Sequence, residues 1–363
     1  MAKQNRVTKI AVSLALAAAA FAFTPVVSAQ TTSAGSTAKQ SSAKKTPARA
    51  STTPAKKKAY SATTARARRA QLARARAAAR QRELRELQTP RFRVDEFGRE
   101  VPDVRAEAAI IYNPETGEVL WEDHAKDQRS IASITKVMTA LVFLESGAAL
   151  SQPVTVQRSD VSHASTTYLR NGYQLTAEDL LNLTLVGSDN AAARALARNS
   201  VWGYEGFIQR MNERARELGL DSTVYADPSG LDANNMSSAF DQARLIAFAA
   251  ADERLGAVMR KTSYTMYVGK RTITANNTNH IIRTGDIDVV GGKTGFISRS
   301  GYCLATLLRL PQSGQQVAFV VLGAKSNQSR FWETRHLFNW MASRTKALLE
   351  GEFQQQHEEE EDE

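Results

Sequence analysis

The chain has 363 residues, a formal net charge of +10 and a single cysteine. One cysteine excludes an intramolecular disulfide, and the five scattered histidines form no cluster with metal-ligand spacing, so we expect neither a metal nor another cofactor. Residues 31–93 carry 17 Lys and Arg against two acids, whereas residues 352–363 carry seven acids and no Lys or Arg. The basicity therefore belongs to an arm, because the part between these segments is nearly neutral.

Residues 1–29 have the composition of a signal peptide. Three basic residues precede a run of apolar side chains at positions 10–23, which is too short to span a membrane comfortably. Small residues precede Gln30, so we predict cleavage after Ala29 and export to the periplasm. An uncleaved anchor is the alternative, and the lack of a cysteine near this site argues against a lipid anchor.

Residues 30–103 form a basic, low-complexity arm that we expect to be disordered apart from a possible helix at 65–88. Up to about residue 64 the arm consists mostly of Ser, Thr, Ala, Lys and Pro, so we expect disorder there. Residues 65–88 are rich in Ala, Arg, Leu and Glu, which predicts a cationic helix with no core-facing stripe. The arm could contact an anionic wall polymer or a membrane surface, serve as a solvated tether, or pair with the acidic tail at 351–363, which we predict to be disordered. Nucleic acid is not expected, because no aromatic residues interleave with the arginines.

Residues 104–350 have the composition of one folded domain. The predicted elements, in chain order, are strands at 107–112 and 118–122 joined by the turn "NPETG", helices at 133–144, 176–198, 204–218 and 237–251, strands at 264–268, 289–293, 302–310 and 316–323, and a closing helix at 330–349. Strands near both ends with helices between them predict an α+β domain, in which the two ends of the chain complete one sheet around a helical insert.

The motif "SITK" places Ser133 and Lys136 at the start of a buried helix. The same Ser-x-x-Lys spacing also occurs at Ser36/Lys39, Ser41/Lys44, Ser42/Lys45 and Ser343/Lys346, three times in the arm and once late in the closing helix. At the start of a helix the backbone N–H of Ser133 is free and the helix dipole favours negative charge. The i, i+3 spacing lets Lys136 reach the hydroxyl of Ser133. Burial would lower the pKa of Lys136 toward neutrality, and we expect a second cation close by to lower it more.

Two further motifs supply polar groups. Ser188 and Asn190 lie in "VGSDNAAAR", a stretch that otherwise reads as helical, where a hydroxyl could relay a proton and an amide could hold the lysine or a substrate carbonyl. Lys293 lies in "GGKTGF" at the end of an apolar run and is the candidate second cation. Its flanking glycines would let an extended ligand approach the strand closely.

In the order Ser-x-x-Lys, Ser-x-Asn and Lys-Thr-Gly, with gaps of about 50 and 100 residues, these motifs form the signature of penicillin-recognising serine peptidases. With "YNPETGEVLWE" and "YADPSGLDANNMSS", the domain resembles the low-molecular-mass penicillin-binding proteins, the serine D-alanyl-D-alanine peptidases, and most of all the endopeptidase type known as penicillin-binding protein 7. The resemblance implies a β-lactamase/transpeptidase-like fold, an antiparallel sheet flanked by helices with an all-helical lobe.

The resemblance also implies a role for each motif residue. Ser133 would be the nucleophile, Lys136 its base and Ser188 a proton shuttle, while Asn190, Lys293, Thr294, Gly295 and Phe296 would bind substrate. The backbone N–H groups of Ser133 and Phe296 would form the oxyanion hole. The segment at 227–230 is predicted to be a turn near the site, and Cys303 to be a buried apolar residue in a strand.

The implied substrates are peptidoglycan stem peptides and crosslinks, with β-lactams as inhibitors. Only about 55 residues separate Gly295 from the acidic tail, which favours an endopeptidase of D-Ala–diaminopimelate crosslinks over carboxypeptidases that carry a further β-rich domain. A carboxypeptidase remains the first alternative. A β-lactamase is a second, although no Glu-x-x-Leu-Asn pattern occurs between residues 190 and 293. A non-catalytic wall-binding protein is a third, against which the intact motif residues argue.

Overall fold

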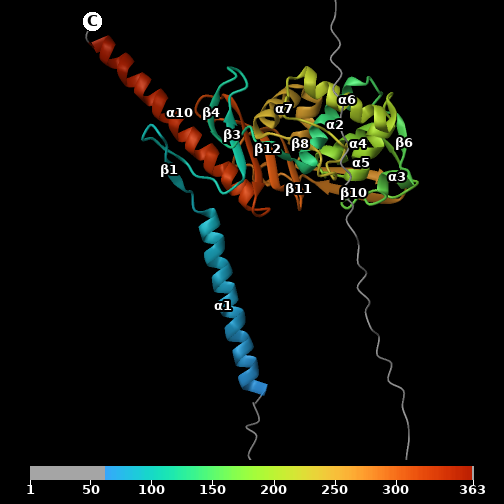
Figure 1. Cartoon of the computed structure of the whole chain (residues 1–363), viewed down its shortest axis with the longest axis horizontal. Coiled ribbons are helices and arrows are strands. Elements are labelled where there is room, and N and C mark those ends of the chain that lie inside the picture. Colours follow the sequence, from blue (N-terminus) through green and yellow to red (C-terminus); the bar gives the residue numbers. More distant parts are fainter. Residues whose placement is uncertain (1–61, 362–363) are drawn as a thin grey trace, which may run out of the picture. The chain divides into compact units, whose positions relative to one another are not determined.

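The computed structural model describes the backbone of residues 62–361 and the side chains of residues 66–350. The predicted signal peptide, its cleavage site and the first half of the arm lie outside these residues. Within the described part, no helix combines the length and apolar character needed to cross a membrane. Figure 1 shows the arrangement of the helices and strands.

The main sheet has five antiparallel strands in the order β11-β12-β13-β3-β4. Its strands are β3 (Ala108–Tyr112), β4 (Val119–Asp123), β11 (Val289–Ile297), β12 (Gly301–Arg309) and β13 (Gln316–Ala324). The early strand β3 pairs with the last strand β13 and β4 pairs with β3, so both ends of the domain complete one sheet, as the sequence predicted. Strand β11 forms one edge and extends beyond the predicted 289–293 to residue 297.

Helices cover both faces of this sheet (Figure 1). Helices α7 (Ala239–Ala251) and α8 (Glu253–Arg260) pack on one face, and α10 (Ser329–Glu361) packs on the other. The alternation of side chains along a strand supplies both interfaces, because Val320 belongs to the core on the α7 side while its neighbours Phe319 and Val321 belong to the core with α10.

The helical lobe lies beyond α7, as the resemblance implied (Figure 1). Its helices, with the short ones nearby, are η1 (Ala132–Thr135), α2 (Lys136–Glu145), α3 (Arg158–Val161), α4 (Ala177–Leu185), α5 (Asn190–Arg198), α6 (Gly203–Glu217) and α9 (His280–Thr284). The two-stranded pairs are β1 (Phe92–Val94) with β2 (Glu100–Pro102), β5 (Arg129–Ser130) with β8 (Met236–Ser237), β6 (Pro153–Thr155) with β7 (Gln174–Thr176), and β9 (Ser263–Val268) with β10 (Arg271–Asn276). Helix α2 packs against α4, α5 and α6, so the lobe surrounds the helix that follows "SITK".

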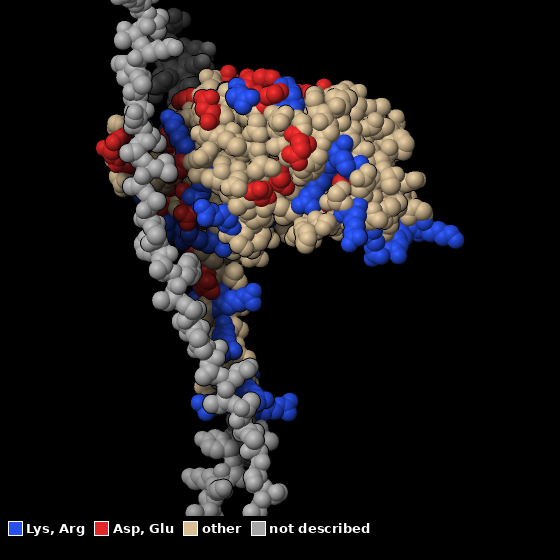
Figure 2. Space-filling model, turned by 45° about the vertical axis from the view of Figure 1, so that its right-hand side comes forward, with Lys and Arg blue, Asp and Glu red and all other residues tan. Residues whose placement is uncertain are grey.

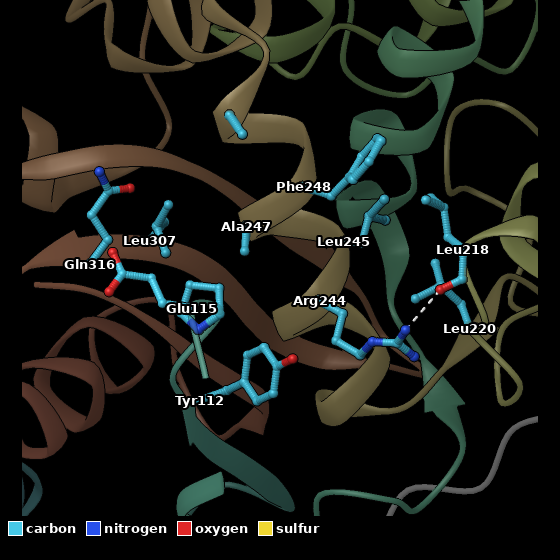
Figure 3. Close-up of a pocket in the computed structure, with 12 residues that line it drawn as sticks. Tyr112, Glu115, Leu218, Leu220, Arg244, Leu245, Ala247, Phe248, Leu307 and Gln316 are labelled. Carbon is cyan, nitrogen blue, oxygen red and sulfur yellow. Dashed lines mark hydrogen bonds between the residues drawn. The ribbon is translucent and has the colours of Figure 1, made fainter. Parts of the chain in front are cut away.

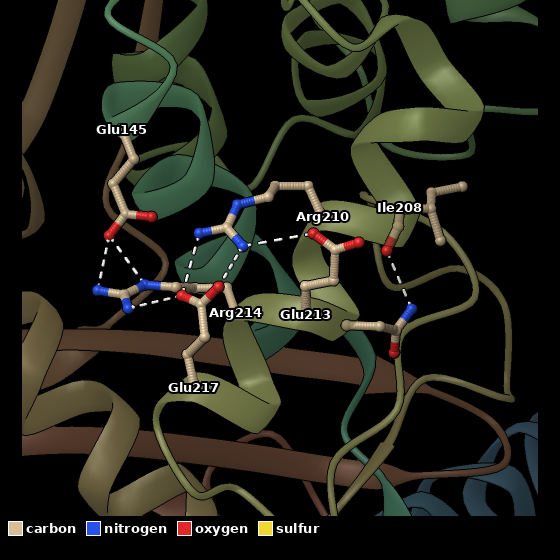
Figure 4. Close-up of polar contacts among 7 residues, drawn as sticks. Glu145, Ile208, Arg210, Glu213, Arg214 and Glu217 are labelled. Carbon is tan, nitrogen blue, oxygen red and sulfur yellow. Dashed lines mark hydrogen bonds and ion pairs between the residues drawn. The ribbon is translucent and has the colours of Figure 1, made fainter.

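A charged cluster joins α6 to the end of α2 (Figure 4). Arg214 donates to Glu145 on α2 at 3.0 Å and to Glu217 on its own helix at 3.0 Å. Arg210 also donates to Glu217, and these hydrogen bonds lower the pKa of Glu217 to about 2. The cluster is at the surface, so it contributes little to stability.

The helix predicted over residues 176–198 is in fact two helices, α4 and α5. The chain leaves the helical conformation at residues 186–189, where Ser188 has φ +57°. Asp189 begins the second helix as its N-cap, because its carboxylate accepts the backbone N–H of Ala192. The Ala- and Leu-rich composition on both sides concealed this break.

The described part of the basic arm contains a helix and a hairpin. Helix α1 (Ala62–Gln88) agrees with the helix predicted over 65–88, and its described side chains are exposed apart from Leu84 and Leu87. Figure 2 shows basic side chains along this helix. Residues 92–102, within the segment expected to be disordered, form the β1–β2 hairpin. Val101 and Val104 are buried in the core with α10, so the folded part begins before residue 104.

At the other end, α10 continues to Glu361 through most of the tail that the sequence predicted to be disordered. The physical reason is local, since Glu and Gln are good helix formers and no proline follows residue 350.

Candidate active site

Ser133 and Lys136 are brought together by a tight turn before α2. Ala132 has φ +48°, after which η1 carries Ser133 into the first turn of the helical segment. The ammonium nitrogen of Lys136 donates to Ser133 Oγ at 2.9 Å. The contact expected from the i, i+3 spacing is therefore present, and Ser133 remains partly exposed.

The side chain of Lys136 is fully buried and has three oxygen partners. Besides Ser133, its Nζ donates to Asn190 Oδ1 at 2.6 Å and to the Ser229 carbonyl at 2.5 Å. Burial lowers the pKa of Lys136 to about 7, although the nearby charges of Asp227 and Asp189 act in the opposite direction. Near neutral pH the amine is therefore available both as a base and as an acid.

Lys293 is the second buried lysine of the site. Its Nζ donates to Ser188 Oγ at 2.8 Å and to the Thr294 carbonyl at 2.9 Å. Burial holds the pKa of Lys293 well below its ordinary value, and repulsion from Lys136 and Arg330 lowers it further. The sequence predicted Lys293 as a main cause of the lowered pKa of Lys136, but burial dominates for both lysines.

The break between α4 and α5 directs consecutive side chains to different places. Ser188 turns toward Lys293, and Asn190 turns toward Lys136 while its amide nitrogen donates to the Ala164 carbonyl at 2.7 Å. Asp189 faces away and accepts from Thr167, from the Tyr168 N–H and from the Ala192 N–H. Both polar groups expected from "SDN" thus reach the lysines because the helix is interrupted.

Strand β11 packs directly against the turn that carries Ser133. A side chain at Gly295 would place a Cβ 2.6 Å from the Ile131 carbonyl and 3.2 Å from the Ser133 nitrogen. Thr294 Oγ1 lies 2.6 Å from Thr278 Oγ1, and Phe296 is 47% exposed. Thr294, Gly295 and Phe296 therefore form one wall of the space above Ser133, and glycine permits the close approach.

The segment "DPSG" at 227–230 is the turn that the sequence predicted near the site. Asp227 accepts the backbone N–H of Ser229 at 3.2 Å and of Gly230 at 2.8 Å. The turn presents the Ser229 carbonyl to Lys136, which sequence reasoning did not foresee. Gly230 lies so close to Ala132 that a Cβ would be 2.1 Å from its carbonyl oxygen.

Sequence reasoning also missed Arg330. Its Nη1 donates to the carbonyls of Gly295 at 3.0 Å and Cys303 at 3.2 Å, and burial lowers its pKa to about 10. No local pattern marks this arginine, because it is simply the start of the predicted closing helix. Cys303 is a buried strand residue, as predicted.

A cleft of about 430 Å³ lies over this site, and the buried Lys136 and Lys293 lie behind its walls. Its walls are formed by Ser133, Ser165, Thr166, Gly187, Ser188, Asn190, Leu231, Thr278, Thr294, Gly295, Phe296, Ile297, Ser298 and Arg330. A second cavity of about 430 Å³ lies beside α7, where Arg244 donates to the Leu218 carbonyl at 3.0 Å (Figure 3). It contains none of the motif residues, so the cleft at Ser133 is the candidate active site.

Within the described residues, no group of three or more His, Cys, Asp or Glu side chains could hold a metal ion. A partly exposed serine that accepts from a buried lysine with a pKa near 7 is suited to nucleophilic acyl transfer. The fold and this pair indicate an acyl-transfer enzyme of the serine type.

Comparison with known proteins gives the family. The model of the peptidase S11 family, D-alanyl-D-alanine carboxypeptidase, matches residues 95–326. The D-alanyl-D-alanine endopeptidase of Escherichia coli (strain K12) is 30% identical over 244 residues, which cover 66% of this chain and 78% of that protein. The chain therefore belongs to the peptidase S11 family and is a serine-type D-alanyl-D-alanine peptidase, an enzyme class that acts on peptidoglycan.

Solved structures agree with this family and with the predicted transpeptidase-like fold. The Streptomyces K15 DD-transpeptidase is 28% identical with a TM-score of 0.62, and the match covers 66% of this chain and 97% of that one. Penicillin-binding protein D2 from Listeria monocytogenes, in its cefotaxime-bound form, is 27% identical with a TM-score of 0.58, covering 65% and 97% of the two chains.

Proposed function

We propose that the chain is an exported endopeptidase of peptidoglycan remodelling, which hydrolyses D-Ala–diaminopimelate crosslinks through an acyl-enzyme on Ser133. The observation that carries the proposal is the 2.9 Å hydrogen bond between Lys136 Nζ and Ser133 Oγ, made by a lysine whose burial lowers its pKa to about 7. A neutral amine at that position can accept the hydroxyl proton as the nucleophile attacks.

In the acylation step, Ser133 Oγ bonds to the D-Ala carbonyl carbon while its proton passes to Lys136. The backbone N–H groups of Ser133 and Phe296 stabilise the resulting oxyanion. Collapse of the tetrahedral intermediate breaks the C–N bond, and the leaving amine receives a proton through the Ser188 hydroxyl, which Lys293 holds at 2.8 Å. Water then attacks the ester, again deprotonated by Lys136, which releases the D-Ala carboxylate and restores the hydroxyl of Ser133.

Substrate binding in this proposal uses the edge strand β11. The carboxylate next to the leaving amine is held at Lys293 and Thr294, and Asn190 orients both Lys136 and the substrate. Gly295 lets the peptide approach the strand, and Arg330 fixes the Gly295 carbonyl from behind at 3.0 Å. Unpaired backbone groups at a sheet edge can bind an extended peptide as an added strand.

The comparisons support two candidate activities. The Escherichia coli relative is described as an endopeptidase, which supports crosslink cleavage as the main reaction. The matching family is described as carboxypeptidase, which supports removal of a terminal D-Ala as the second candidate. The cefotaxime-bound relative supports β-lactams as inhibitors that acylate Ser133. A periplasmic location rests on the signal peptide predicted at residues 1–29.

The basic arm is proposed to hold the enzyme near an anionic surface, either a wall polymer or the membrane. The exposed arginines of α1 support this role, since a solvated cationic helix attracts polyanions at low ionic strength (Figure 2).

The test of the mechanism is mass spectrometry of the mature protein after brief exposure to a penicillin. Trypsin releases the peptide at 130–136, "SIASITK", and the proposal expects a stable penicilloyl adduct on it. Rapid drug loss without an adduct would indicate a β-lactamase. An unmodified peptide with intact drug would refute serine acylation.

The test of the substrate is digestion of purified muropeptides. An endopeptidase converts crosslinked dimers to monomers, whereas a carboxypeptidase converts pentapeptide monomers to tetrapeptides and free D-Ala. The Ser133→Ala variant should lose both reactions, and retention of either would contradict the assigned nucleophile.

A further inference from the structure

A separate cavity of about 360 Å³ adjoins the candidate active site at Phe296. Phe296 lines both spaces, and its ring stacks on that of Tyr302 with the centroids 4.1 Å apart. The cavity on the far side of this pair is bordered by Arg129, Arg299 and Lys325, with Glu107 as the acidic member. The two aromatic rings thus separate the catalytic cleft from a pocket with an excess of basic side chains.

Arg129 is the central basic group of this pocket. It lies on the short strand β5, four residues before Ser133, and is partly buried. Its Nε is inaccessible to solvent and has no hydrogen-bond partner among the described residues. A ligand cannot reach this enclosed nitrogen, but the guanidinium group borders the cavity, so an anion bound there would offset its charge.

The backbone nearby leaves room for that arginine. Gly323 has φ +77°, and a Cβ there would lie 3.1 Å from Arg129 Nη2 and 2.7 Å from Glu107 Cγ. A side chain at this position would therefore displace both charged groups. The left-handed conformation and the lack of space both require glycine.

The charges of the pocket do not cancel. Glu107 is paired with Lys325, and this hydrogen bond lowers the pKa of Glu107. Neither Arg129 nor Arg299 has a carboxylate within ion-pair distance among the described residues. Two guanidinium groups are left to bind an anion, and carboxylates match their planar donor geometry.

The position of the pocket along β11 determines which part of a substrate reaches it. This step rests on the proposed function, which places the leaving-group carboxylate at Lys293 and Thr294 and the scissile carbonyl at the Phe296 N–H. A peptide extended along the strand then continues past Phe296, away from Lys293, toward residues 297–302. The part that arrives there is amino-terminal to the scissile D-Ala.

We propose that Arg129 and Arg299 form a subsite for a carboxylate on the acyl-donor stem peptide, beyond the Phe296–Tyr302 pair. Two residues of the donor stem peptide can supply this carboxylate. One is the residue directly before the scissile D-Ala, and the other is the residue before that one. The subsite would favour stem peptides that carry the free acid over those that carry its amide.

The primary test is binding, measured by calorimetry on the Ser133→Ala protein so that no cleavage occurs. The probes are three donor stem peptides. One carries both free carboxylates, one has the carboxylate next to the scissile D-Ala amidated, and one has the carboxylate of the residue before that amidated. The proposal expects one of the two amides to weaken binding by on the order of tenfold. The Arg129→Gln and Arg299→Gln double variant should bind the free acid and that amide within about twofold of each other.

The matched control is Arg283→Gln, which removes an exposed arginine outside the pocket and should leave the preference intact. Equal binding of acids and amides by the Ser133→Ala protein would overturn the subsite, as would a preference that survives the double substitution. Each substitution is also made in the protein with Ser133 intact. Labelling of these variants by a fluorescent penicillin shows that they are folded.

A kinetic measurement separates this inference from the function on which it rests. With Ser133 intact, kcat/KM for muropeptide dimers should show the same preference for the free acid. If the binding preference is present and no dimer is cleaved, the endopeptidase proposal fails while the anion subsite stands.

Discussion

Lys136 combines complete burial with three oxygen partners, and its pKa of about 7 follows from that environment. The group is a lysine whose neutral form is the base, so its reactive fraction increases as the pH rises through 7. We expect kcat/KM for acylation by a penicillin to rise with pH and to level off above about pH 8. The check is a pH profile of the acylation rate measured on the full mature protein.

The control is Lys136→Arg, which keeps a positive charge that cannot be lost at these pH values and should abolish acylation. A wild-type profile that is flat between about pH 5.5 and 8.5, or that rises only near pH 10, would contradict the assignment of Lys136 as the base.

Gly230 tests the contact between the "DPSG" turn and the nucleophile turn. Its φ is +77°, and an added Cβ would lie 2.1 Å from the Ala132 carbonyl oxygen, which is backbone and cannot rotate away. Gly230→Ala should lower the free energy of unfolding by about 2–4 kcal/mol, from backbone strain and overpacking together. Denaturant unfolding measures the change.

Gly314 provides the matched comparison, because it has φ +71° but no atom within 4 Å of an added Cβ. Gly314→Ala should therefore lower the free energy of unfolding by only about 1 kcal/mol, which comes from the strained backbone conformation alone. Similar losses at the two glycines would show that the close approach to Ala132 has no energetic consequence.

At the level of elements, the interruption between α4 and α5 is what delivers Ser188 and Asn190 to the two lysines. Asp189 holds the interruption in place by capping α5 and by accepting the Tyr168 N–H at 2.6 Å. Asp189→Ala should destabilise the domain by about 1–3 kcal/mol and also slow penicillin acylation, because Asn190 would lose its fixed position. Unfolding curves and acylation rates are the two measurements.

Asp252→Ala removes an N-cap of the same kind from α8. This variant should lose stability while acylating at the wild-type rate. If Asp189→Ala also acylates normally in its folded fraction, the cap has no role in positioning the site.

The predicted helices and strands that agree best with the structure are those that one continuous stretch of sequence determines. Short, largely apolar runs predicted β3, β12 and β13 to within a residue, and the bounds predicted for the helices α6 and α7 agree to within two residues. The segment at 176–198 was misassigned because Ala and Leu are strong helix formers on both sides of the break. "SDN" contained the capping aspartate, but its effect depends on partners such as Tyr168 that lie 21 residues earlier.

At the scale of the whole molecule, the β1–β2 hairpin joins the core with α10 although it belongs to a low-complexity segment. The ring nitrogen Nε2 of His336 lies 2.8 Å from the Arg91 carbonyl, and Val101 is buried beside α10. Deleting residues 30–89 should therefore leave the melting temperature nearly unchanged. Deleting residues 30–103 should lower it by roughly 5–10 °C, because buried apolar surface is lost.

Thermal unfolding of the two truncated proteins compares these outcomes directly. If both truncated proteins melt at the temperature of the untruncated protein, the domain boundary lies at residue 104, as the sequence analysis predicted. If both melt at the same lower temperature, α1 rather than the hairpin contributes the stability.

The sequence by itself determined the family, the order of the three motifs and the α+β class, because these depend on residue identity, spacing and short-range periodicity. It also predicted the contact of Ser133 with Lys136, since an i, i+3 pair within a helical turn is a local property. Only the tertiary structure decided which groups complete the site: the Ser229 carbonyl, Arg330 and the interruption before Asp189. The lowered pKa values of Lys136 and Lys293 likewise come from burial, which depends on packing between segments distant in the sequence.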